Sequence, residues 1–192
     1  MGLDGQVTLV TGIGQVEGSS LDFFYRITNG LEVPILLLTP LGRFEGEDLR
    51  PSRDRVYAYV DPEGVLQLTK RFWPVPDDID VVFPDVPFAT EVASGKVFEE
   101  RLALPLPIKV DIPYLLDPEE IEKKREEIVG IAEGMVFSIG YLVEEEGPLW
   151  QRRLDPTTGA EFTMRYGTVA KHQRILHGGL LDVGVPVRDL RR

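Results

Sequence analysis

The side chains that carry most enzyme chemistry are few in this chain and form no catalytic pattern. Its 192 residues include no cysteine and only two histidines, which excludes thiol nucleophiles, thiolate zinc sites and iron–sulfur clusters. His172 and His177 are spaced so that they fall on different faces of either a helix or a strand. Neither has a nucleophile or an orienting acid beside it in the sequence. We therefore assign no catalytic residue, no cofactor and no metal ligand from the sequence.

Carboxylates are plentiful, but only one group of them suggests a cation site. Asp77, Asp78 and Asp80, with Asp85 beyond them, offer oxygen ligands suited to calcium. The segment lacks the glycine and the terminal glutamate of an EF-hand loop, so a polar loop is the simpler interpretation, and cation binding stays open. A glycosidase needs two acids at a defined separation in space, and nothing selects a pair among the 32 acidic residues.

A glycine-rich segment near the start does not fit dinucleotide binding. Residues 6–11 read as a strand that runs into Gly12 and Gly14, which resembles the opening of the short-chain dehydrogenases. Val16, however, stands where that family's turn requires a glycine. A pyrophosphate site also needs a helix directly after the glycines, whereas an alternating strand pattern follows here. The sequence predicts a first strand and then a glycine-rich loop.

The charges are divided unevenly along the chain. The net charge is −11, but residues 151–192 carry eight basic and four acidic residues, a net of +4. Residues 1–150 therefore carry a net of −15. A body this acidic disfavours nucleic acid. The basic segment could instead lie against its own body, a second copy or another acidic protein, although solubilising charge alone would also explain the division.

We place the candidate interaction surface on basic and aromatic residues. The aromatic pair lies in a proline-bracketed segment, residues 72–76, which suits either a binding surface or the protection of an edge strand. The candidate interaction residues are Arg152, Arg153, Arg165, Lys171, Arg174, Phe72 and Trp73.

Two adjoining segments carry the strongest β signal. Residues 21–28 alternate between apolar and polar, the period of a half-buried strand. Residues 33–38 are almost wholly apolar and fit a strand that is buried on both faces. A hairpin with an odd connection over residues 29–31 would set Ile27 opposite Val33. The same parity holds if the second strand crosses to an opposing sheet.

Other segments complete a mainly β pattern. Residues 41–55 read as a loop, and Asp61–Gly64 suits a type I turn between two strands. One helix is expected near 117–129, because Asp117 is a good N-cap and Pro118 suits the first helical position. Further strands are predicted over residues 56–60, 65–69, 81–83, 97–104 and 135–143, around the hairpin turn 155–159, and near 173–176 or 180–185.

These patterns predict an antiparallel β-sandwich with immunoglobulin-like architecture, one short surface helix and an irregular C-terminal segment. We expect residues 1–150 to form the sandwich, and residues 151–192 to form a basic hairpin and tail that pack on it or on a partner. The chain begins with neither a basic nor an apolar leader, and no apolar run approaches the length of a membrane span. A cytoplasmic location without membrane contact is therefore expected.

Two hypotheses for the function follow. The first is a non-catalytic structural or protein-interaction module, a subunit of a homo- or hetero-oligomeric assembly that uses its basic C-terminal segment. The alternative is a ligand-binding or hydrolytic β-domain with a carboxylate-lined cleft. The absence of a catalytic pattern favours the first hypothesis.

Overall fold

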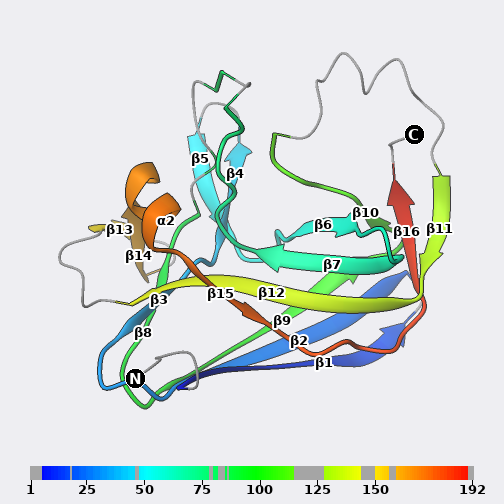
Figure 1. Ribbon diagram of the computed structural model, residues 1–192, viewed down its shortest axis with the longest axis horizontal. Helices are drawn as coiled ribbons and strands as arrows, with labels where there is room; N and C mark the ends of the chain where they lie inside the picture. The colour runs from blue at the N-terminus through cyan, green and yellow to red at the C-terminus, as the bar shows by residue number, and fades with distance from the viewer. Residues whose placement is uncertain are drawn as a thin grey trace.

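The computed structural model describes residues 6–17, 19–45, 48–77, 80–81, 85, 87–114, 128–143, 150–155 and 159–189. Two sheets face each other across one apolar core, so the molecule is a mainly β sandwich (Figure 1). The immunoglobulin-like comparison stays a prediction. No helix in the described part of the chain is long and apolar enough to cross a membrane.

The first sheet consists of three antiparallel strands, β1 (Val7–Glu17), β2 (Ser20–Asn29) and β9 (Val97–Pro105). β2 lies in the middle and pairs with both neighbours. Every second side chain of β2 is buried, as the alternation in the sequence predicts. The glycines at positions 12 and 14 belong to β1, which continues past them with an irregularity between Ile13 and Val16, so the predicted glycine-rich loop is wrong.

The second sheet is built around β12 (Gly134–Val143), which pairs with three strands. β7 (Val65–Lys70) runs parallel to its first part, whereas β3 (Ile35–Leu37) and β15 (Arg174–His177) run antiparallel to it. The sandwich is therefore not wholly antiparallel. The remaining members are β6 (Tyr57–Val60), paired with β7, and β8 (Thr90–Val92), paired with β3.

The remaining elements surround this sandwich. β4 (Leu41–Glu45) and β5 (Asp48–Ser52) form a hairpin where a loop was predicted. β13 (Trp150–Asp155) and β14 (Gly159–Met164) form the predicted C-terminal hairpin, whose turn lies outside the described residues. A three-stranded sheet joins β10 (Ile108–Lys109), β16 (Val185–Asp189) and β11 (Ile128–Ala132). One short helix, α2, covers Tyr166–His172.

The two central segments do not form a hairpin. β2 and β3 lie in opposite sheets, which is the alternative that the same parity allows. The predicted shared face is confirmed: Phe23, Tyr25 and Ile27 from β2 meet Ile35 and Leu37 from β3 in the main core. The prediction that the second segment is buried on both sides is also confirmed, because the alternate side chains of residues 36 and 38 belong to a smaller second core.

Other predicted elements have mixed outcomes. The turn from Asp61 to Gly64 is confirmed: the Gly64 N–H donates to the Asp61 carbonyl at 3.0 Å, and Gly64 has a φ of +83°, which glycine adopts without strain. The expected helix over 117–127 lies outside the described residues, while Ile128 and Val129 belong to β11 and not to a helix. The strand expected over 81–83 also lies largely outside them.

The C-terminal segment packs on the sandwich itself. β15 adds to β12, and β16 joins β10 and β11. Val169 of α2 is fully buried in the second core, on the outer face of the larger sheet. The described residues of this segment therefore contribute to the fold.

Candidate functional site

The structure places a solvent-open cavity of about 390 Å³ between the two sheets. β6 and β7 supply one wall, the end of β9 supplies the other, and β10 together with residues 54–56 closes it. Its volume lies within the range of small-molecule sites. The apolar lining consists of Val56, Ala58, Leu68, Leu104 and Ile108, together with Pro105 at the end of β9 and Pro107 before β10. We call this cavity the interlayer pocket.

Arg55 is the most strongly held charge in the interlayer pocket. Its Nη1 donates to the carbonyl of Gly42 and lies 3.4 Å from Asp85 Oδ2. Its Nε lies 3.5 Å from Asp111 Oδ2, and its guanidinium stands 5.1 Å from the centre of the Tyr57 ring. The charge of Arg55 is thus largely offset by protein carboxylates, and its position is defined.

Tyr57 supports the same arrangement from behind the pocket. Its hydroxyl donates to Asp85 Oδ2 at 2.5 Å, while the backbone N–H of Asp85 donates to the hydroxyl of Tyr114. Burial, with the Asp85 charge in second place, raises the pKa of Tyr57 far above its usual 10. Tyr57 therefore stays a neutral donor and acts as a structural group.

Two cations of the interlayer pocket form no ion pair with the described residues. Among the described residues neither Arg43 nor Lys109 takes part in an ion pair, and both are exposed at the rim. The remaining carboxylate of the lining, Asp54, is close enough to the buried Lys70 to favour its charged form. Asp54 is exposed and lines the same pocket as the two cations.

Beside the pocket lies a buried polar cluster that joins the two sheets. Lys70, at the end of β7, has a fully buried side chain, and Glu100 of β9 is 7% exposed. Lys70 Nζ donates to Glu100 Oε2 at 2.5 Å, to the Arg53 carbonyl at 2.6 Å and to Thr39 Oγ1 at 3.2 Å. Three acceptors satisfy the three N–H groups of an ammonium ion. The Tyr25 hydroxyl also donates to Glu100 Oε2.

Burial changes the titration of this cluster. It lowers the pKa of Lys70, and the Glu100 carboxylate opposes that effect. It raises the pKa of Tyr25 well above 10, and the charge of Glu100 adds to the rise. Because its groups are hydrogen-bonded inside the core, the cluster links the sheet of β2 and β9 to the sheet of β7 through polar contacts.

Sequence reasoning did not find this cluster, although a signal for it exists. Glu100 alternates with Phe98 and Leu102, so the period of two places it on the core face of its strand. Lys70 follows Leu68 at the same spacing in β7. A charged residue at a core position of each of two strands implies that they meet, because an unpaired buried charge is costly.

The aromatic candidates contribute to the fold. Phe72 is 2% exposed and belongs to the second core, where its ring meets that of Tyr166 edge-on at 5.0 Å. The Gln173 side chain accepts from the Phe72 N–H at 2.8 Å and donates to its carbonyl at 3.2 Å. Trp73 is half-buried under the guanidinium of Arg71, 3.8 Å from its ring centre. Phe72 is thus the place where the C-terminal segment docks on its own domain.

The basic candidates are not brought together into one patch by any described contact. Arg165 and Lys171 are exposed at the two ends of α2, and Arg174 is half-buried at the start of β15. Arg152 and Arg153 lie in β13, and their side chains fall outside what the structure describes.

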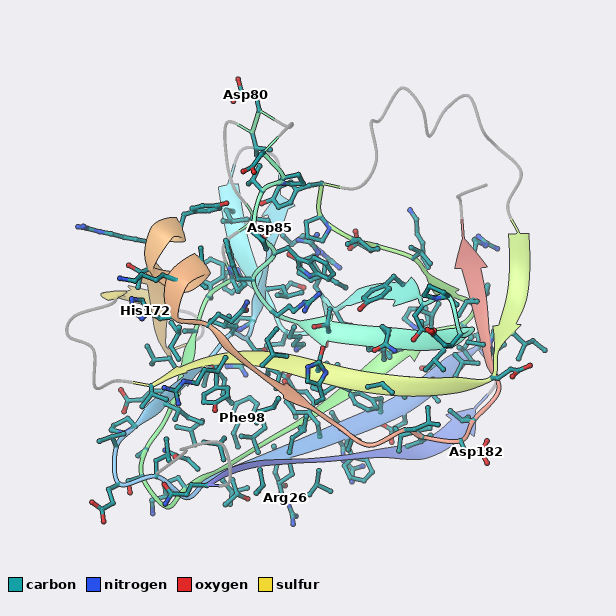
Figure 2. The ribbon with its side chains drawn as sticks, in the orientation of Figure 1. Arg26, Asp80, Asp85, Phe98, His172 and Asp182 are labelled. Carbon is teal, nitrogen blue, oxygen red and sulfur yellow. The ribbon has the colours of Figure 1, made fainter. Side chains whose placement is uncertain are left out.

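The aspartates and histidines singled out in the sequence do not converge either. Asp85 is engaged by Arg55 and Tyr57, Asp80 lies at an exposed position apart from it, and Asp78 falls outside the described residues (Figure 2). His172 lies on α2, away from these acids (Figure 2). Within the described ranges no three His, Asp or Glu side chains are grouped so that they could hold a metal ion.

Comparison with protein-family models, with curated proteins and with solved structures found no match for this chain.

Proposed function

We propose that this protein is a non-catalytic binding module that takes up a small molecule in the interlayer pocket. The observation that carries the proposal is the pocket itself: it is open to solvent, of ligand size, and combines apolar walls from both sheets with charged groups at its rim. Such a combination is typical of small-molecule sites.

The groups around the pocket suit binding better than hydrolysis. The two carboxylates in its lining, Asp54 and Asp111, are exposed. The buried carboxylate nearby, Glu100, is held by Lys70 and Tyr25. Among the described residues, the lining of the pocket therefore offers no buried carboxylate that could act on a bound substrate.

Filling the pocket is expected to abolish binding. Ala58 is buried on its wall, so the Ala58→Leu side chain occupies space that a ligand needs. We expect the amide shifts that a fragment mixture induces around the pocket in ¹H–¹⁵N NMR spectra to disappear in this variant. The matched control is Ala103→Leu, because Ala103 is exposed on β9 and does not line the pocket.

One result of the same NMR experiment would contradict the proposal. If the same fragments shift the same amides in Ala58→Leu as in the wild type, the ligand lies elsewhere. Urea unfolding of both variants separates this result from a loss of folding, since overpacking a core position typically costs about 1–3 kcal/mol.

A second candidate function is association with an acidic partner or a second copy through the C-terminal segment. The observation that favours it is the exposure of Arg165 and Lys171 at the ends of α2, whose other face is anchored by Val169. Deleting this segment would not test the idea, because its strands pair with β10, β11 and β12. Surface charge reversal is the suitable change.

The double variant Arg165→Glu/Lys171→Glu is expected to fold normally and to lose association. Light scattering at low and high salt measures it, because contacts between exposed charges weaken as salt rises. The control is Lys96→Glu, another exposed lysine, in the turn before β9. If wild type and double variant have the same mass at both salt concentrations, the proposal of self-association is contradicted. If an added acidic polypeptide changes the scattering of both proteins equally, the proposal of an acidic partner at these residues is contradicted.

A further inference from the structure

We infer that the ligand of the interlayer pocket is an amphipathic anion, with an apolar body inside the sandwich and a negatively charged head at the rim. This inference rests on the proposed function, because it names the chemical class of molecule for the same site. It follows from two properties of the pocket, the composition of its floor and the charges that remain unpaired at its mouth.

The floor of the pocket is apolar and comes from both sheets. Ala58 and Leu68 belong to the larger sheet, Leu104 to the smaller one, and all three also belong to the main core. A hydrocarbon body placed there would extend the core, and the burial of its apolar surface would favour binding. A fully polar ligand would lose its hydration at this floor without compensation.

Two cations at the rim lack an ion pair within the described part of the chain. Arg55 faces Asp111 and Asp85 at 3.5 and 3.4 Å, so its charge is offset within the protein. Asp54 is an exposed carboxylate of the same lining and forms no ion pair within the described part of the chain. Arg43 of β4 and Lys109 of β10 then remain without ion pairs among the described residues. Two cations without an ion pair at one pocket are notable in a chain whose net charge is −11.

The head group is therefore expected to lie between Arg43 and Lys109. A carboxylate or phosphate accepts hydrogen bonds from both a guanidinium and an ammonium ion. A cationic head would instead face these two charges and would be disfavoured at close range.

Isothermal titration calorimetry with octanoate, octylammonium and acetate tests the inference on the full chain at low salt. We expect octanoate to bind, acetate to bind much more weakly for lack of an apolar body, and octylammonium to bind more weakly than octanoate. The variant Arg43→Gln/Lys109→Gln should weaken octanoate roughly threefold to tenfold, as for partly exposed charge pairs. Binding of 1-octanol should be unchanged in it. Lys96→Gln is the control.

The outcomes separate the two proposals. If octylammonium binds as tightly as octanoate, or if the double variant binds octanoate like the wild type, the anion preference is overturned while pocket binding stands. If none of these probes binds and the fragment mixture also leaves the pocket amides unshifted, both the anion inference and the proposed function are contradicted. If octanoate binds equally well to Ala58→Leu, the site lies outside the pocket and the inference is overturned.

Discussion

Lys70→Met is expected to lower the free energy of unfolding by about 3–5 kcal/mol, because it leaves the Glu100 carboxylate in the core without its cation. Glu100 is 7% exposed, and its remaining charged neighbour, Arg53, stands 3.6 Å away and is half exposed. Removing both charges in Lys70→Met/Glu100→Gln should cost less than the sum of the two single changes. The glutamine still accepts from Tyr25, and no unpaired charge stays buried. Urea unfolding measures all four proteins of this cycle.

A matched control shares strand β9 with the buried pair. Arg26 of β2 and Glu99 of β9 also form an ion pair, but both side chains are 58% exposed, and Figure 2 shows Arg26 on the solvent side of its sheet. The cycle Arg26→Met/Glu99→Gln should show a coupling energy below about 1 kcal/mol, as exposed pairs do. Equal coupling in the two cycles, or a cost below about 1 kcal/mol for Lys70→Met, would contradict the role of the buried pair.

The folded protein is expected to lose stability steeply above pH 10. Burial raises the pKa values of Tyr25 and Tyr57 above the usual 10. Above pH 10 the unfolded chain has therefore lost protons that the folded chain retains, so each tyrosine lowers the unfolding free energy by about 1.4 kcal/mol per pH unit. Lys70 acts in the opposite direction, because its lowered pKa makes stability rise with pH up to 10.5, above which its contribution is constant.

Urea unfolding between pH 10.5 and 12 checks this slope, and tyrosinate absorbance checks its cause. The denatured chain should ionise all six tyrosines, whereas the folded chain should retain at least two protonated at pH 11. Tyr25→Phe and Tyr57→Phe should each make the slope shallower by about 1.4 kcal/mol per pH unit. An unchanged slope in both variants would show that these hydroxyls titrate in the folded state as they do in the unfolded chain.

Both predictions concern groups next to the interlayer pocket. The carbonyl of Arg53 accepts from Lys70, and the two residues that follow it line the pocket. Tyr57 and Arg55 share the carboxylate of Asp85. Changes that loosen the buried cluster should therefore also weaken ligand binding, through the position of this short segment.

Much of the strand pattern could be predicted from the sequence alone. The alternation in β2, the two-sided burial of β3, the turn before β7 and the apolar run of β12 are all local. Local pattern reports which way a side chain faces, because successive residues of a strand point to opposite sides. The same pattern predicts a loop over residues 41–55, which is wrong. The polar hairpin of β4 and β5 has no apolar alternation that would indicate strands.

Only the tertiary structure decided which elements meet. The alternation of β2 is the same whether it pairs with β3 or with β1 and β9. In the structure β2 pairs with β1 and β9. The interlayer pocket and the Lys70–Glu100 pair join strands that are distant in the chain. The sequence pattern places Lys70 and Glu100 at core-facing positions, but it does not show that these two residues contact each other. Their pairing depends on how the sheets stack, because a charge is tolerated in the core only where the opposing sheet supplies its counter-charge.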